Sequence, residues 1–223
     1  MNLKINPTVL LVTILSLGIL LTFTRSVWLN LAMIIGASLY LVFNRPAFKK
    51  ILLIGLFVLP LAFGTWWSFI VYGTGDTWHN AWIFSTRIYA YVWLGIALTF
   101  TNSVDELLFS LVQNIRLSAT FAYGILAAFN LLNKIRRQVK IIRYAGQVRG
   151  ITYHFWQPQL YFKAIIVALT WSGDLAEAMT SHGFSEGFSR SHYQTIPLPL
   201  WQWLIPIGVL ALSLSFLVIC QPW

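Results

Sequence analysis

Apolar residues along the chain come in long runs whose lengths predict membrane-spanning helices. Four runs lie in the first hundred residues, at about 9–23, 27–43, 51–71 and 83–100, and a fifth lies at about 200–219. A helix needs roughly 20 mostly apolar residues to cross the hydrocarbon core of a bilayer, which is about 30 Å thick. Because backbone polar groups must be paired inside lipid, these runs should be helical. The pattern therefore predicts an all-α integral membrane protein with about five transmembrane helices.

The composition supports this fold class and excludes two others. Of the 223 residues, 58% are hydrophobic and only 9% are charged, whereas soluble domains are about 25% charged. The many aromatic and aliphatic residues exclude a disordered chain. The single cysteine, Cys220, excludes a scaffold held by disulfides within the chain.

The net charge of +9 is explained by membrane topology rather than by nucleic acid. Basic residues collect in the cytoplasmic loops of membrane proteins, and Arg45, Lys49 and Lys50 lie between the second and third runs. Residues 72–82 contain no Lys or Arg, so this connection should be external, and the stretch after Phe100 should be cytoplasmic. With five spans, the N-terminus is expected inside and the C-terminus outside. Four tryptophans form a candidate interfacial belt around the external connection: Trp66, Trp67, Trp78 and Trp82.

Between the fourth and fifth runs lie about 100 residues that are too polar for lipid-facing helices and too apolar for a loop. We predict three helices here. A short amphipathic helix starts at Ser103, which is followed by two acidic residues that favour a helix N-terminus; it lies either on the lipid surface or on its own protein. Two longer helices follow at about 120–149 and 158–182. The predicted division is thus 1–100 for the N-terminal transmembrane helices, 101–199 for a cytoplasmic region and 200–223 for the last transmembrane helix.

The second half of the 120–149 helix is strongly basic. At about 100° per residue, Arg136, Lys140 and Arg143 share one face. Solvation together with attraction to anionic headgroups explains such a face, and so does docking of a partner protein. The residues alone leave both interpretations open.

The two long helices end in a similar way. The first ends in Arg149-Gly150 and the second in His182-Gly183. Glycine commonly ends a helix in the left-handed conformation, and a cation just before it is favoured by the helix dipole. Such an end presents a basic side chain that suits a carboxylate-lined groove in a partner. Ordinary helix capping also explains each end, so both interpretations stay open at this point.

Three segments in this region resemble the T component of energy-coupling factor (ECF) transporters. They are Thr101-Asn102-Ser103-Val104-Asp105-Glu106-Leu107-Leu108, Gln147-Val148-Arg149-Gly150-Ile151, and Ala176-Glu177-Ala178-Met179-Thr180-Ser181-His182-Gly183-Phe184. In that family, paired Ala-Arg-Gly motifs end two long, crossed coupling helices.

The resemblance implies a non-catalytic membrane scaffold in the prokaryotic plasma membrane. It would be attached through the two helix ends to a pair of cytoplasmic ABC ATPase subunits, which bind the ATP and Mg. It would also hold a small membrane S component that binds a vitamin or a transition-metal ion. No cofactor is then expected in this chain.

Carried over residue by residue, the resemblance makes Val148, Arg149 and Gly150 the first docking motif and Ser181, His182 and Gly183 the second. His182 stands where the family has arginine. A histidine side chain cannot make a two-pronged carboxylate contact, so this end would dock through a neutral hydrogen bond or through a histidine protonated by an acidic partner. Either case suits a transporter with dedicated ATPases.

Several other features limit the possible functions. The chain has no Gly-x4-Gly-Lys-Ser/Thr loop, so it should not hydrolyse ATP itself. The histidines are scattered and predict no metal site: His79, His154, His182 and His192. Arg87, inside the fourth run, is a functional candidate by default, although extension of its side chain to the interface also explains it.

Two rival functions remain open. Asp174 and Glu177 share a helix face and could act as an acid/base pair in a membrane enzyme. A stand-alone permease or a receptor for another cytoplasmic partner is also compatible with the sequence.

Overall fold

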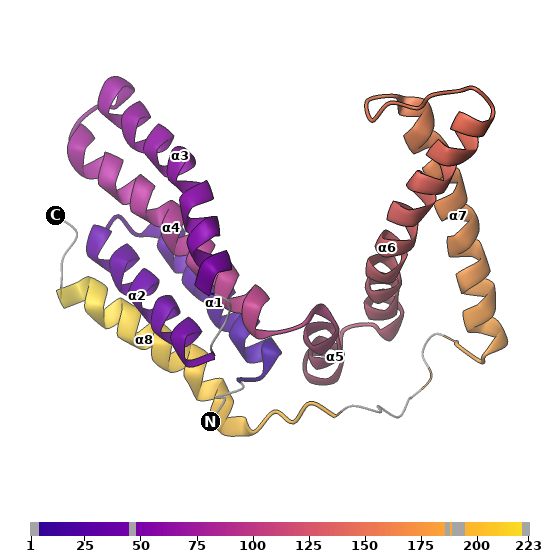
Figure 1. Ribbon diagram of the computed structural model, residues 1–223. Coiled ribbons are helices and arrows are strands. Elements are labelled where there is room, and N and C mark those ends of the chain that lie inside the picture. The colour runs from indigo at the N-terminus through magenta and orange to yellow at the C-terminus, as the bar shows by residue number, and fades with distance from the viewer. Residues whose placement is uncertain (1–4, 45–47, 186–187, 189–194, 220–223) are drawn as a thin grey trace. The chain divides into compact units, whose positions relative to one another are not determined.

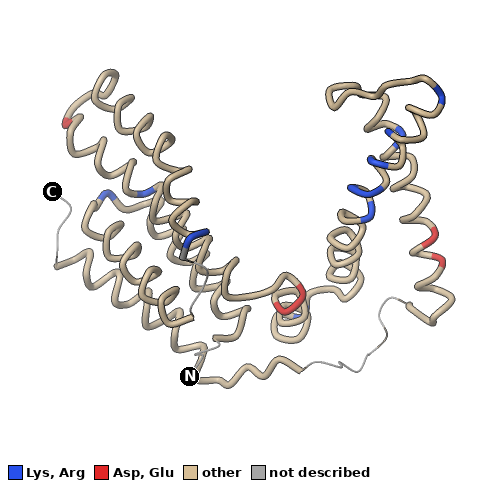
Figure 2. Tube along the Cα trace, viewed as in Figure 1, with Lys and Arg blue, Asp and Glu red and all other residues tan. Residues whose placement is uncertain are grey.

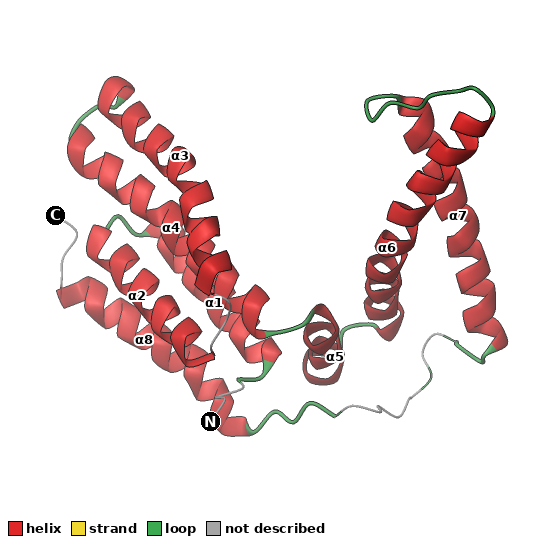
Figure 3. Ribbon diagram, in the orientation of Figure 1, coloured by secondary structure: helices red, strands yellow, loops and turns green. Residues whose placement is uncertain are grey.

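The computed structural model describes residues 5–44, 48–185, 188 and 195–219, and every regular element in them is helical (Figure 3). The all-α prediction is therefore confirmed. In chain order (Figure 1) the elements are α1 (Pro7–Phe23), α2 (Val27–Asn44), α3 (Phe48–Tyr72), α4 (Thr77–Thr101), α5 (Val104–Ile115), α6 (Ala119–Val148), α7 (Pro158–Ser181), the 3₁₀ turn η1 (Leu200–Trp203) and α8 (Leu204–Ile219).

Five apolar helices correspond to the five predicted spans. Four segments of the described chain are long and apolar enough to cross a membrane, namely α2, α3, α4 and η1 together with α8. The fifth, α1, has 17 residues, or about 26 Å at 1.5 Å per residue. This is the lower end of the length that spans a bilayer, roughly 17–25 residues.

Helix α4 begins six residues earlier than the apolar run had indicated. Asp76 caps it by accepting a hydrogen bond from the backbone N–H of His79 at 3.4 Å, and the first turns are helical although they are polar. The predicted connection 72–82 is therefore reduced to residues 73–76. The difference arises because hydropathy reports contact with lipid, whereas a capping side chain sets where the helix starts.

The chain packs as two compact units. Residues 1–115 and 196–223 form the first unit, and residues 116–195, with α6 and α7, form the second. Helix α5 packs on α1 and so belongs with the apolar helices by its contacts, although we had grouped residues 101–199 by their expected location. This agrees with the interpretation of α5 as an amphipathic helix lying on its own protein.

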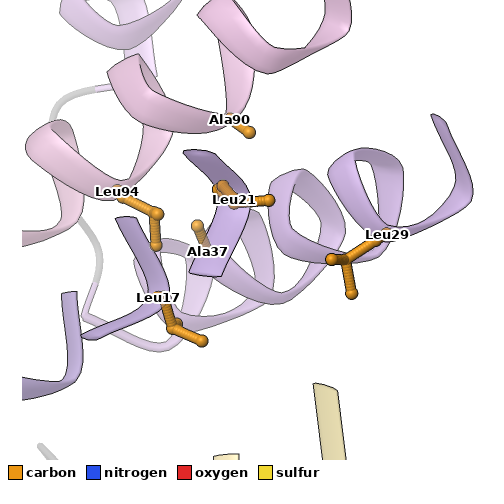
Figure 4. Packing of buried hydrophobic residues seen from close by; sticks show 6 residues of the cluster. All are labelled: Leu17, Leu21, Leu29, Ala37, Ala90 and Leu94. Carbon is orange, nitrogen blue, oxygen red and sulfur yellow. The ribbon is translucent and has the colours of Figure 1, made fainter. Parts of the chain in front are cut away.

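Within the first unit, α4 packs along both α2 and α3, and α1 contacts α4, α5 and α8 (Figure 1). The largest buried cluster joins α1, α2 and α4 (Figure 4): Leu17, Leu21, Leu29, Ala37, Ala90 and Leu94. Large apolar side chains cover the outward faces, including Phe57, which is 83% exposed. Such a surface fits lipid as the surrounding solvent, because apolar residues need no burial there.

Polar side chains fix how the apolar helices meet. The Asn30 amide of α2 donates to the Ile83 carbonyl of α4 at 3.0 Å, and the Trp93 indole donates to the Ser38 hydroxyl at 2.7 Å. Hydrogen bonds between helices contribute about 0.6–2 kcal/mol each inside membranes.

Three of the predicted belt tryptophans contact one another at the α3–α4 connection, with ring centroids 5.7–6.4 Å apart: Trp66, Trp78 and Trp82.

The N-terminus of α5 has the capping arrangement that its sequence indicates. The backbone N–H of Glu106 donates to the Ser103 hydroxyl at 3.2 Å, and the backbone N–H of Ser103 donates to the Glu106 carboxylate at 3.3 Å. This reciprocal pair is a capping box, which satisfies two backbone donors at once.

A buried polar cluster ties α1, α5 and the segment before α8 together. We call it the polar clasp and define it by Asn6, Thr8, Ser110, Asn114 and Gln202. The Asn6 side-chain oxygen accepts from the Thr8 backbone N–H at 3.0 Å, which caps α1, and from the Ser110 hydroxyl at 2.6 Å. The Asn6 backbone N–H donates to the Gln202 side-chain oxygen at 3.1 Å.

Ser110 is the centre of the clasp on α5. Its hydroxyl is fully buried, lies 2.5 Å from the Thr8 hydroxyl and accepts from the Asn114 amide at 3.0 Å. Beside the clasp, the Ile196 backbone N–H donates to the Gln113 side-chain oxygen at 3.0 Å. The segments next to both junctions with the second unit, 115/116 and 195/196, are thus held at one place in the first unit.

We expect Ser110→Ala to destabilise the first unit, because it removes the buried hydrogen bonds that the Ser110 hydroxyl makes with Asn6, Thr8 and Asn114. The loss should be about 1–3 kcal/mol, or roughly 2–4 °C in Tm for each kcal/mol. Thermal unfolding in detergent would measure it. Thr99→Ala is the matched control, since the exposed Thr99 hydroxyl bonds only to the Gly95 carbonyl of its own helix. Equal stability of the two variants would contradict this role of the clasp.

Candidate functional site

Helix α6 ends in a Schellman motif built around Gly150. The Gly150 N–H donates to the Gln147 carbonyl at 3.0 Å, and the Ile151 N–H donates to the Gly146 carbonyl at 2.9 Å. Gly150 has φ +72°, the left-handed conformation that glycine adopts without steric cost. Arg149 is the C-cap residue, and its side chain is exposed beyond the last turn.

Helix α7 ends with the same geometry around Gly183. The Gly183 N–H donates to the Thr180 carbonyl and the Phe184 N–H donates to the Met179 carbonyl, both at 2.9 Å. Gly183 has φ +80°, and the C-cap residue His182 has φ −84° and ψ 11°, close to the −91° and 11° of Arg149. The predicted left-handed glycine is thus present at both ends, and each end exposes its C-cap side chain.

The two ends lie at opposite ends of the pair formed by α6 and α7. These helices pack against each other and cross in Figure 1, with α7 running back from the residue 149–157 connection. Phe184, just past the end of α7, contacts Tyr123 at the start of α6, with ring centroids 5.9 Å apart. From Tyr123 to Arg149 is about 39 Å along a helix rising 1.5 Å per residue. One partner groove therefore cannot hold both ends.

Tyr153 packs against the last turn of α6, a contact that was not predicted from the sequence. Its side chain is 6% exposed and lies directly against Gly146. A Cβ on residue 146 would come within 2.4 Å of the Tyr153 ring, so glycine is required there for packing and not for its φ angle. The Lys163 ammonium group of α7 donates to the Tyr153 hydroxyl and lies 4.5 Å from its ring centroid. These contacts join both helices to the 149–157 connection.

The surface around the α6 end combines positive charge with exposed apolar side chains. Figure 2 shows basic residues along the second half of α6. Of the predicted basic face, Arg136 and Lys140 are exposed, whereas the Arg143 guanidinium lies 4.9 Å above the Phe155 ring. Val148 is 89% exposed and Trp156 is 95% exposed. Exposed aromatic and aliphatic groups beside an arginine are typical of protein interfaces.

The α7 end differs in its charge. His182 lies on a groove between α6 and α7, which is also lined by Lys134 and Asp174. Glu177 is exposed one turn before the end. The first end is thus basic, whereas the second carries both signs of charge.

The acidic pair considered for a membrane enzyme lies on the surface of α7, with Asp174 in the same groove as Lys134 and His182. Asp174 and Glu177 are exposed on α7. Within the part of the chain that the structure describes, no three His, Cys, Asp or Glu residues lie together as a metal site would require. His79 and His154 sit in capped turns at the starts of α4 and α7, while His192 and Cys220 fall outside the described residues.

Helices long and apolar enough to span a membrane, together with a separate packed pair of helices that have matching exposed ends, are the features of a multi-pass membrane protein. Comparison with protein families identifies its class. The chain belongs to the cobalt transport protein family (CbiQ), whose sequence pattern matches residues 2–193. Proteins of this family are the T components of ECF transporters, so the resemblance seen in the sequence is confirmed. Comparison with curated proteins gave no match.

Gly146→Ala should loosen the α6 end, because the new methyl group would displace Tyr153. Hydrogen exchange of residues 147–153 should become about tenfold faster or more, equivalent to a loss of about 1.4 kcal/mol. Gly124→Ala on the same helix is the control, since nothing lies within 4 Å of its added Cβ and alanine favours a helix. Unchanged exchange in Gly146→Ala would show that Tyr153 does not hold this end.

Proposed function

We propose that this chain is the transmembrane scaffold of an ECF-type importer, and that its α6 and α7 ends dock on two cytoplasmic ABC ATPase subunits. The observation that carries the proposal is the pair of matching Schellman ends at opposite ends of one helix pair. Each helix end can enter one partner groove. The two ends are separated by about 39 Å along α6, so each could dock on a different ATPase subunit. Membership in the family supports the same arrangement, because its T components work in complexes with ATPases and a substrate-binding component.

In this proposal the first docking motif is Val148, Arg149 and Gly150. The glycine turns the chain away, so that the Arg149 side chain can enter a groove and pair with a carboxylate through two parallel hydrogen bonds. Val148 and Trp156, both almost fully exposed, would cover the rim of that groove and exclude water from the ion pair. Arg136 and Lys140 would add longer-range attraction to an acidic partner surface.

The second docking motif is Ser181, His182 and Gly183. The backbone is the same as at the first end, but imidazole replaces guanidinium, and Asp174 and Glu177 are nearby on α7. We infer a partner contact that depends on one hydrogen bond and on shape rather than on a two-pronged ion pair. The two ATPase contacts would therefore differ in strength and in their dependence on salt.

The family description names cobalt, which supports a transition-metal ion as the cargo. We propose that a separate S component binds the transition-metal ion in the membrane, and that this chain transmits the movement of the ATPases to it. ATP and Mg would be bound by the ATPase subunits. A vitamin as cargo is the alternative within the same transporter class.

Arg149→Glu should abolish co-purification with the ATPase subunits. Loss of one partner of a charge pair that is buried in the complex costs about 2–5 kcal/mol, so affinity should fall by at least about 30-fold. Pull-down of the complex from membranes would measure the loss. Arg137→Glu is the control, because it makes the same charge change on α6 at an exposed position twelve residues before the end. If both variants lose the ATPases equally, general electrostatics and not the helix end determine docking.

His182→Arg should keep the complex intact, because arginine is the family residue at this position and the C-cap conformation suits either side chain. Co-purification yield and its resistance to salt should equal or exceed those of the natural chain. Loss of the ATPases in this variant would mean that the partner groove is shaped for imidazole.

A further inference from the structure

Arg87 contacts the α1–α2 connection, and this contact was not predicted from the sequence. Its guanidinium donates a hydrogen bond to the Thr24 carbonyl, and its central carbon lies 4.9 Å above the Phe84 ring. These contacts direct the charged group toward residues 24–26. The Arg87 Nε is buried and has no hydrogen-bond partner.

A second cation, Arg25, directly follows Thr24 in the α1–α2 connection and is exposed. Because Arg87 donates to the Thr24 carbonyl, its guanidinium lies against the backbone that carries Arg25. In the residues that the structure describes, no carboxylate forms an ion pair with either arginine; the nearest acidic residue in sequence to Arg87 is Asp76, which caps the start of α4. Two neighbouring cations are thus left without a counter-charge from the described protein.

The position of this pair defines which anion can reach it. A connection of three residues between two apolar helices must lie near the level of the lipid headgroups. Phe23 and Trp28, 83% and 67% exposed, flank the pair with surfaces suited to acyl chains and to the interface. At this depth the phosphate of a phospholipid is the abundant anion, and guanidinium groups bind phosphate through paired hydrogen bonds.

The topology makes the pair unusual as well. On the predicted orientation, residues 24–26 and 73–76 are on the same external side, and the second connection has no Lys or Arg. External loops are normally poor in basic residues, so a pair of arginines there requires a specific reason. Because a charge near the membrane interior is costly without a partner, a bound anion supplies that reason.

We propose that Arg25 and Arg87 together bind the phosphate of a phospholipid headgroup, which is held where α4 meets the α1–α2 connection. Arg25 approaches the phosphate from the exposed side. Arg87, whose guanidinium is fixed by Thr24 and Phe84, provides the other hydrogen-bond donors to the phosphate. The bound lipid then neutralises the pair and joins α4 to the α1–α2 connection. This inference goes beyond the proposed function and does not depend on the ATPases.

The test titrates the delipidated full-length chain in detergent with phosphatidylglycerol and follows binding by native mass spectrometry. Diacylglycerol with the same acyl chains isolates the contribution of the phosphate. We expect saturable binding of phosphatidylglycerol only, weakened about tenfold by Arg25→Gln, the size expected for loss of one charge-assisted contact. Arg25 is exposed, so this variant should fold. Arg87→Lys keeps the charge but loses the planar donors, and should also weaken binding.

Lys50→Gln is the matched control, because Lys50 is an exposed basic residue at the start of α3, on the predicted cytoplasmic side. It should leave the affinity unchanged. Equal weakening by Lys50→Gln, or no effect of Arg25→Gln, would overturn the site. Inorganic phosphate that binds as tightly as the lipid would overturn the assignment to a headgroup and indicate a soluble anion.

Discussion

Asn6 makes the contacts on which the arrangement of the first unit depends. This one residue caps α1, accepts the Ser110 hydroxyl of α5 and donates to Gln202 before α8. Because these groups are buried, each hydrogen bond must be made, and breaking one leaves a polar group without water. Apolar side chains in a lipid-facing bundle can slide past one another at little cost, whereas a directional polar cluster fixes one arrangement.

Both chain connections to the second unit leave the first unit beside the clasp. There the Gln113 side-chain oxygen accepts a hydrogen bond from the Ile196 backbone N–H. The second unit is itself organised by a local constraint, the Tyr153 ring packed on Gly146 and held by Lys163. In each unit a few polar or aromatic contacts determine how the long helices are arranged. The helices make up most of the unit, but their apolar surfaces alone do not select one arrangement. The Tyr153 contacts fix the backbone at the proposed α6 docking end.

Much of the local structure could be predicted from the sequence. The bounds of α6 and α7 differ from the predicted ones by one residue at most, because apolar periodicity and a terminal glycine are local signals. The left-handed Gly150 and Gly183 follow from the same signals. The start of α4 was misplaced because Asp76 caps a polar first turn. The role of Tyr153 was missed because no local pattern in the sequence links it to Gly146 or Lys163, which it contacts only in the folded chain.

An all-helical membrane protein with two glycine-ended helices is predictable from the amino-acid pattern, because the lengths of apolar runs and helix-ending residues act over a few turns. Which side chains contact one another is seen only in the folded chain. It joins Asn6 to Ser110 and Gln202 across 104 and 196 positions, and it directs Arg87 to Thr24. It also places the Arg149 and His182 ends at opposite ends of one pair. These contacts depend on how the helices pack against one another. The periodicity of a sequence specifies which face of a helix is apolar, but not which neighbouring helix that face will contact.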